Sequence, residues 1–236
     1  GRNAGETEIT TDDGIEVFQD EKYYHLKKNV KINSDDFDLF GDDIKIFFEN
    51  DLYDIKVIDA VNNVKLESLK YNINASGINL KFKIESEEIN ISGIGSELIT
   101  DNAKMFSDGV IQVNNLNGKF FLKGKNSKLE SIDIFIEGNN IDGQFSSNNE
   151  IKEILYLNVY DEKISHIITE DAEMFAKKIN YNKETSIIDL EYNVKIIRDG
   201  ETVSGDKGVL NMNNNSYKIK SNDTQKVKVV ITNKDE

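Results

Sequence analysis

The sequence predicts an all-β protein built from many short antiparallel strands. Three observations predict it. Apolar and polar residues alternate in short runs throughout the chain, and clusters of Asn, Asp and Gly separate these runs. The apolar residues are mainly Ile, Val, Leu and Phe, which favour strands. Because strand-like runs recur about every ten residues from end to end, we expect antiparallel strands with one apolar face.

The alternation has a period of two residues, which is typical of a half-buried strand. It is clearest in residues 44–48, 78–84, 132–137 and 155–160. The intervening "NSDD", "FGDD", "EGNN" and "RDG" are turn sequences. One stretch, Glu170 to Lys178, has some helical character. Its sister copies are too short and too interrupted by Gly for a helix, so we predict strand there as well.

Composition excludes several classes of site. The chain has 236 residues, a net charge of −14, 38% hydrophobic and 31% charged residues, and no Cys, Pro or Trp. The lack of Cys excludes disulfides and thiolate metal ligands. No run of about 18 apolar residues is present to span a membrane. An acidic chain repels nucleic acid and anionic membrane surfaces, so neither is an expected partner.

A long internal repeat relates the two ends of the sequence. Residues 26–56 align without a gap over residues 190–220, in phase with the apolar alternation. The identical positions include Leu26 with Leu190, Asn29 to Ile32 with Asn193 to Ile196, and Gly41-Asp42 with Gly205-Asp206. Repeats of this kind indicate that one structural unit recurs along the fold.

A short phrase marks where each copy opens. It reads "ITTDDGIEVF" at residues 9–18, "ITDNAKMF" at 99–106 and "ITEDAEMF" at 168–175. We therefore expect one continuous domain over residues 1–236, with passes at about 9–98, 99–167 and 168–232.

These motifs resemble the LptA/OstA-like family. The elements that carry the resemblance are Thr169 to Phe175, Leu190, Asn193 to Ile196 and Gly205-Asp206, with their counterparts in the first pass. The resemblance covers nearly the whole chain. It departs from the family at Lys28 and Tyr192, where a Gly is usual, and in having three passes where a shorter member has two.

The resemblance implies an open, twisted β-jellyroll that forms a trough. It implies a periplasmic carrier, its signal peptide presumed removed, that binds the acyl chains of lipopolysaccharide (lipid A) and passes it from the inner to the outer membrane. The implied partners are LptC-like and LptD-like trough domains and further copies joined head to tail. Which branch of the family this chain represents is left open, an LptC-like or LptD-like domain included.

A curled sheet turns every second side chain inward, which predicts the residues that line the trough. They are Val30, Ile32, Ile44, Ile46, Phe48, Ile55, Val57, Ile132, Ile134, Ile136, Val194, Ile196, Val203, Leu210, Met212 and Ile219. An uncurled stack also has unpaired strands at its two ends, which join partners unless they are blocked. The predicted edge residues are Ile15, Val17, Val227, Val229 and Ile231.

Other chemistries have weaker support. His25 and His166 lack the Ser and Asp partners of a hydrolase, and we expect them on strand surfaces. The acidic cluster from Asp35 to Asp43 lacks the spacing of a known Ca²⁺ loop, and we expect a solvated turn. No enzymatic activity, cofactor or metal is predicted. The competing function is a structural or adhesive β-solenoid, which would close its core where a carrier keeps a seam that opens.

Overall fold

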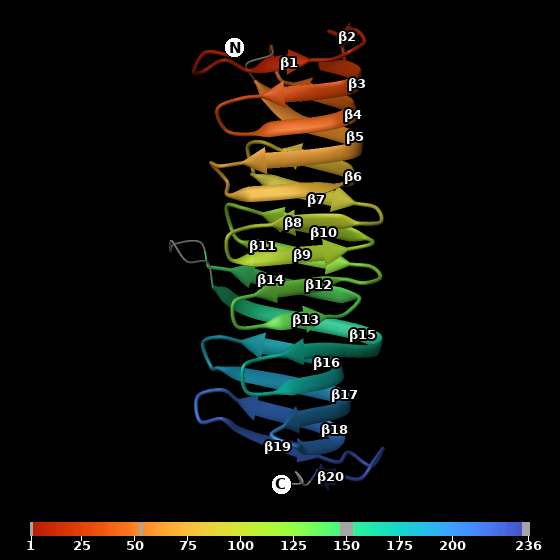
Figure 1. The fold of residues 1–236 in the computed structure, drawn as a ribbon, viewed down its shortest axis with the longest axis vertical. Helices are drawn as coiled ribbons and strands as arrows, with labels where there is room; N and C mark the ends of the chain where they lie inside the picture. Colours follow the sequence, from red (N-terminus) through yellow and green to blue (C-terminus); the bar gives the residue numbers. More distant parts are fainter. Residues whose placement is uncertain (1, 52–53, 147–152, 233–236) are drawn as a thin grey trace.

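The protein is an elongated column of stacked strands. A computed structural model describes residues 2–51, 54–146 and 153–232. The strands lie across the long axis, and the chain runs from the N-terminal end to the C-terminal end of the column (Figure 1). Within the described residues, twenty strands form a single sheet. The predicted all-β fold is confirmed, and most of the stretch with helical character lies in strand β16 (Glu173–Asn182).

Eight strands are long and twelve are short. The long ones are β3 (Tyr23–Asn33), β4 (Asp38–Phe48), β5 (Ile55–Ser68), β6 (Ile73–Lys83), β15 (Ile154–Ile168), β16, β17 (Ile187–Arg198) and β18 (Glu201–Asn211). The short ones are β1 (Glu8–Thr10), β2 (Ile15–Phe18), β7 (Glu88–Ser92), β8 (Ser96–Ile99), β9 (Ala103–Ser107), β10 (Val110–Asn114), β11 (Lys119–Lys123), β12 (Lys128–Ser131), β13 (Phe135–Glu137), β14 (Asn140–Phe145), β19 (Ser216–Lys220) and β20 (Lys228–Ile231).

The sheet is bent lengthwise into two arms. Each long strand contributes one half to each arm, and the short strands belong to one arm alone. We call the arms after their central short strands. The β7 arm has the stacking order β2, β3, β4, β5, β6, β7, β10, β11, β14, β15, β16, β17, β18, β19. The β8 arm has the order β1, β3, β4, β5, β6, β8, β9, β12, β13, β15, β16, β17, β18, β20.

Left-handed residues and register shifts create the bend. Lys28 and Asn29 have φ of 65° and 47°, and the repeat equivalents Tyr192 and Asn193 have 69° and 56°. The pairing register shifts at each of these pairs. These bulges turn β3 and β17 from one arm into the other, and Asn62 and Asn63, with φ of 63° and 52°, mark a third such shift in β5. Gly would adopt the positive φ of Lys28 and Tyr192 without steric cost.

The repeated Gly-Asp dipeptides lie on the same bend. Gly205 has no room for a side chain, since a Cβ there would lie 2.4 Å from the Ile219 side chain. Asp42 accepts a hydrogen bond from the side-chain amide of Asn63 at 2.7 Å. Asp206 instead accepts backbone N–H groups of Asn222, Thr224 and Gln225, and the first of these bonds is the main reason that its pKa is lowered. These contacts fix successive strands to one another at the bend.

The second and third copies of the opening phrase form tip turns of the β8 arm. The hydroxyl oxygens of Thr100 and Thr169 accept hydrogen bonds from the backbone N–H of Ala103 and Ala172. The first copy is placed differently, because residues 11–14 carry the chain across the bend from β1 to β2. The recurring phrase is therefore a turn signal in two of its three positions.

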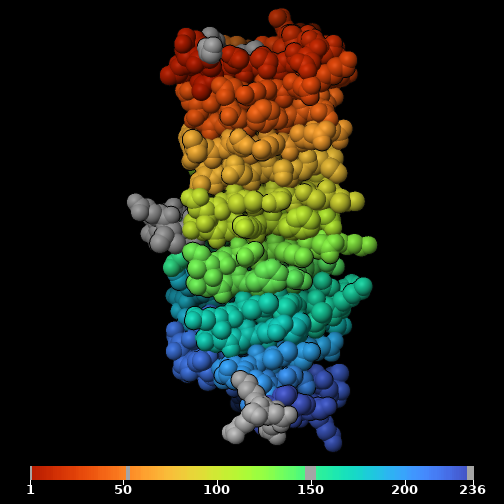
Figure 2. Space-filling model, in the orientation of Figure 1, coloured from red at the N-terminus to blue at the C-terminus, as the bar shows by residue number. Residues whose placement is uncertain are grey.

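The core lies between the two arms. Inward side chains from both arms form one continuous hydrophobic cluster from Leu26 to Leu210. The face seen in Figure 2 shows the strands as successive bands of close-packed atoms from the N-terminal to the C-terminal end. The arms are thus packed against one another along the column, and the interior is a filled core.

Two of the predicted inward residues lie elsewhere. Val57 pairs with Phe47 on the outer face, next to Ile58, which is fully buried. The bulge where Phe48 pairs with Ile55 reverses the alternation at this point. Ile132 is 78% exposed because the chain turns between Ser131 and Ile134. Simple alternation was wrong at both positions.

Candidate apolar site between the two arms

The interior is lined mainly by apolar side chains, most of them aliphatic. The other predicted lining residues point inward: Val30, Ile32, Ile44, Ile46, Phe48, Ile134, Ile136, Val194, Ile196, Val203 and Leu210 are buried, and Ile55, Met212 and Ile219 are partly buried against the core. None of these side chains offers a strong hydrogen bond. The lining therefore suits flexible hydrocarbon chains better than a polar ligand of defined shape.

The tips of the two arms meet along a line that we call the seam. The seam lies opposite the bend. Among the described residues, no strand pairing joins the tips of the β7 arm to those of the β8 arm. The contacts that close the seam are made by side chains, and they differ along its length.

Aromatic rings close the N-terminal part of the seam. Phe37 and Tyr71 lie in tip turns of the β8 arm, and Phe82 points inward from β6 in the β7 arm. The ring centroids of Phe37 and Phe82 are 5.3 Å apart, and those of Tyr71 and Phe82 are 5.8 Å apart, both edge to face. Such pairs are favourable by about 1 kcal/mol each beyond their buried area.

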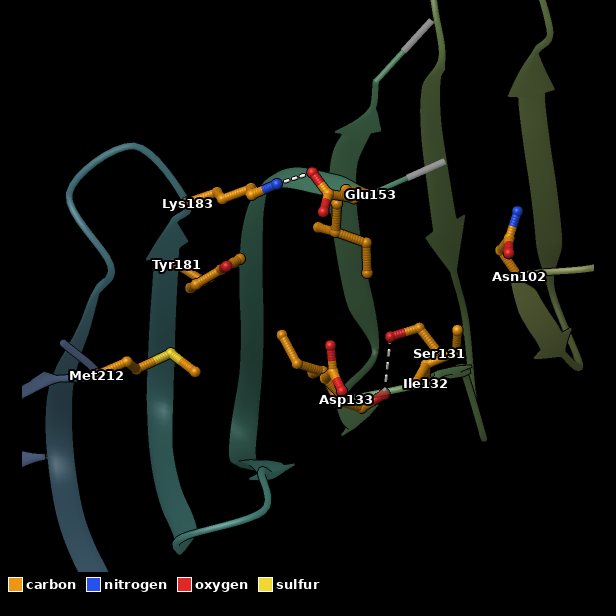
Figure 3. A pocket seen from close by; sticks show the side chains of 10 residues that line it. Asn102, Ser131, Ile132, Asp133, Glu153, Tyr181, Lys183 and Met212 are labelled. Atoms are coloured by element: carbon orange, nitrogen blue, oxygen red, sulfur yellow. Dashed lines mark hydrogen bonds and ion pairs between the residues drawn. The ribbon is translucent and has the colours of Figure 1, made fainter. Parts of the chain in front are cut away.

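The middle of the seam contains a hollow of about 180 Å³. Tyr181 and Met212, from the β7 arm, lie on one side of it, and Ile132 lies on the other side, at a tip of the β8 arm (Figure 3). Burial is the main cause that raises the pKa of the Tyr181 hydroxyl, and the Asp133 carboxylate raises that pKa further. The hollow therefore joins an apolar wall to a polar rim.

An ion pair borders this hollow on the side of the β7 arm. The ammonium group of Lys183 contacts the carboxylate of Glu153, as the dashed line in Figure 3 marks. Both residues belong to the same arm, so the ion pair does not hold the seam closed.

Polar contacts close the C-terminal part of the seam. The Tyr217 hydroxyl on β19 donates a hydrogen bond to the Glu201 carboxylate at the start of β18. The guanidinium of Arg198 donates to the backbone carbonyl of Asn215 at 2.8 Å and lies 4.8 Å from the Tyr217 ring centroid. Arg198 and Glu201 belong to the β8 arm, whereas Asn215 and Tyr217 belong to the β7 arm. We call these four residues the clasp.

The predicted edge residues lie on the terminal strands, but on different arms. Ile15 and Val17 are on β2, at the N-terminal end of the β7 arm, and about half of each is exposed. Val229 and Ile231 on β20, with Val227 just before it, are exposed at the C-terminal end of the β8 arm. In a straight stack of copies, β2 would therefore meet β19 of the next copy, and β20 would meet β1.

The two histidines have structural partners on the outer faces. His25 Nε2 lies 2.8 Å from an Asp43 carboxylate oxygen, and His166 Nε2 lies 2.8 Å from a Glu173 carboxylate oxygen. His166 also stacks on Phe175, with ring centroids 4.2 Å apart. Neither histidine lies beside a Ser or Cys nucleophile in these contacts.

The acidic cluster is divided among separate partners. Asp35 bonds to Arg2 and to the backbone N–H of Gly5, and the Arg2 bond is the main reason that its pKa is lowered. Asp42 accepts a hydrogen bond from the side-chain amide of Asn63, and Asp43 contacts His25. Among the described residues, no group of three or more His, Cys, Asp or Glu side chains is arranged to hold a metal ion.

Sequence patterns missed the residues that close the seam. Phe37, Tyr71 and Tyr217 follow or lie in turns, and Arg198 and Glu201 flank the tip between β17 and β18. Aromatic residues at turns were the available signal. Their partners lie on the other arm and become evident only once the bend is known.

These features define a class: an all-β protein whose single bent sheet encloses an apolar interior along a seam of side-chain contacts. Within the described residues, we find no helix of the length and apolar character needed to cross a bilayer.

The fold was compared with those of known proteins. Neither a protein-family model nor a curated protein matches the sequence. Among solved structures, the chain is similar to LptH from Pseudomonas aeruginosa, described as the LptA homologous periplasmic component of the conserved lipopolysaccharide transport device. The TM-score is 0.24 with 9% sequence identity, over 97% of this chain and 96% of that chain. A match at this TM-score carries no functional conclusion.

Proposed function

We propose that this protein is a carrier that shields long acyl chains between its two arms. The finer form of the proposal is a periplasmic protein that binds the acyl chains of lipopolysaccharide and passes it from the inner to the outer membrane. No catalytic step is part of this role.

The seam between the arms is the main observation that supports a carrier role. Side-chain contacts close it, so the arms can part at their tips while the strand pairing within each arm remains intact. An acyl chain taken from a bilayer could then enter between the arms. Its contacts with the apolar side chains would replace the contacts that the two arms make with each other.

Burial energies are of the required size. Each CH₂ group removed from water contributes about 0.8 kcal/mol, so an acyl chain of about a dozen carbons gains on the order of 10 kcal/mol. This is an upper bound here, because the arms must lose their contacts with each other as the chain enters. The gain is large enough that release must be driven by a partner.

Net charge determines where the headgroup lies. A chain with a net charge of −14 repels phosphate groups. The headgroup therefore stays in water outside the seam, where counterions screen it, and acyl burial determines the affinity. Raising the salt concentration should weaken acyl binding little.

Head-to-tail assembly fits the strand order. Each arm contains an even number of antiparallel segments, so its first and last strands run in opposite directions. A translated copy would therefore continue both arms with antiparallel pairing, β19 to β2 and β20 to β1. The same edges would accept trough domains of LptC-like or LptD-like partners.

Photocrosslinking in lipopolysaccharide-producing cells tests the proposal. A photoreactive residue at Ile46, which is fully buried between the arms, is compared with one at Lys45 on the outer face of the same strand. Lipopolysaccharide adducts at position 46 and not at 45 are expected. Equal labelling at both positions, or labelling at neither, would refute the carrier role.

The filled interior favours one other function. Side chains such as Ile32, Leu39 and Leu98 are completely buried, as in a permanent core. A structural or adhesive β-column would keep this core closed. Crosslinking to protein alone, with no lipid adduct at position 46, would support that function.

A further inference from the structure

A polar groove runs along the outer face of the β7 arm, on the other side of the sheet from the interior. Two hollows of about 630 and 400 Å³ share Asn180. Outward side chains of β14 to β19 line both hollows, so together they form one groove over the C-terminal half of this arm. We call it the outer groove.

Tyr192 is an exposed residue of the outer groove, and its backbone has a strained, left-handed conformation. Tyr192 lines the larger hollow, is 59% exposed and has φ of +69°. A bulky side chain at positive φ is a genuine outlier, and such strain is found preferentially at functional sites. The repeat equivalent Lys28 has nearly the same φ and lines neither hollow. The bend therefore does not require an aromatic residue at this position.

The charge of the groove is opposite to that of the chain. Five lysines line it, against the carboxylates of Asp142, Asp189 and Glu191. Glu191 contacts Lys178 and Lys207 at 3.7 Å each. Among the described residues, Lys177, Lys218 and Lys220 make no ion pair. These three lysines give the groove a local positive charge on a chain of net charge −14, which favours an anionic ligand.

Side-chain amides supply the remaining recognition groups. Asn140, Asn158 and Asn180 line the groove, and the Asn158 amide donates to an Asp142 carboxylate oxygen at 2.9 Å. Each amide pairs a donor with an acceptor, which matches adjacent hydroxyl groups of a sugar. The ring of Tyr160, 45% exposed, adds a second flat apolar surface for a sugar face.

We propose that the outer groove binds an acidic oligosaccharide, with Tyr192 as the ring on which a sugar stacks. A peptide strand is disfavoured because the backbone groups here are already paired within the sheet. A nucleic acid carries too dense a charge for so acidic a chain. The site is separate from the interior, so it does not depend on the acyl-carrier role.

Titration with hexagalacturonate tests the proposal, using cellohexaose as the neutral probe and hexathymidylate as a denser polyanion. We compare the wild type with Tyr192→Gly, which relieves the backbone strain, and with Lys28→Gly at the equivalent bend. Hexagalacturonate should bind saturably to the wild type and to Lys28→Gly alike. Tyr192→Gly should weaken binding about tenfold or more while its thermal unfolding temperature stays the same or rises.

A second variant tests the charge. Lys218→Gln with Lys220→Gln should weaken hexagalacturonate binding and reduce its dependence on salt, and cellohexaose should bind the wild type more weakly than hexagalacturonate does. The proposal is overturned if the wild type shows no saturable binding, if Tyr192→Gly binds as well as Lys28→Gly, or if hexathymidylate binds as tightly as hexagalacturonate.

Discussion

The Tyr217 hydroxyl on the last strand of the β7 arm donates a hydrogen bond to the Glu201 carboxylate on the β8 arm. This bond crosses the seam at its C-terminal end, whereas Phe37 and Phe82 close the N-terminal part with aromatic contact alone. Hydrogen bonds therefore close the C-terminal end of the seam, and aromatic contacts close its N-terminal part. Polar contacts depend on pH and hydrogen bonding, and aromatic contacts do not.

Removing the Tyr217 hydroxyl should loosen the clasp. Tyr217→Phe leaves the Glu201 carboxylate without its donor, and we expect the free energy of unfolding in urea to fall by about 1–2 kcal/mol. Uptake of a fluorescent fatty acid should rise if the seam admits acyl chains. Tyr156→Phe is the matched control, because the Tyr156 hydroxyl has no hydrogen-bond partner among the described residues. Equal stability of the two variants would show that the Tyr217 hydrogen bond does not stabilise the closed seam.

The clasp should also weaken at alkaline pH. Burial, followed by the Glu201 hydrogen bond and charge, raises the pKa of Tyr217 to about 12. An unfolded Tyr has a pKa of about 10, so the stabilising contribution is complete below pH ~10 and is lost as the pH rises towards 12. The pKa values of Tyr71 and Tyr181 are also raised, so phenolate absorbance of the wild type is compared with that of Tyr217→Phe, which should lack the tyrosine that titrates at about pH 12. Glu201→Gln should bring that titration to lower pH.

Much of the interior follows from the sequence, and its exceptions have local causes. Period-two alternation correctly places Ile44, Ile46 and Ile196 between the arms. It fails at Val57, where a bulge adds a residue, and at Ile132, where the chain turns. Bulges depend on pairing with a neighbouring strand, so the pattern of one strand alone does not reveal them.

The seam was less predictable than the lining. Glu201 and Tyr217 meet because the bend brings two arms together, and no spacing in the sequence encodes that contact. Tyr192, in contrast, could be singled out from the sequence, because the resemblance led us to expect a Gly at this position. The structure explains the departure in part, since the position has positive φ and its ring lies in the outer groove.

The interior should be the main source of stability, whatever it binds. Ile46→Ala should lower the free energy of unfolding by about 2–4 kcal/mol, because the side chain is fully buried and its removal leaves a cavity. Lys45→Ala, one residue away on the outer face, should change it by less than about 1 kcal/mol. Urea unfolding of the two variants measures the difference. Similar losses would show that the arms are not packed against each other in solution.

The bend should depend on Asn63 through both its backbone and its side chain. Asn63 has φ of +52°, and its side-chain amide donates to Asp42 at 2.7 Å. Asn63→Gly keeps the positive φ and loses only the hydrogen bond, so the free energy of unfolding should fall by about 1 kcal/mol or less. Asn63→Ala also introduces steric strain at positive φ, which adds about 1–2 kcal/mol to the loss. Chemical denaturation of both variants separates the two contributions. If Ala and Gly were equally tolerated, the left-handed backbone would not be what turns this strand from one arm into the other.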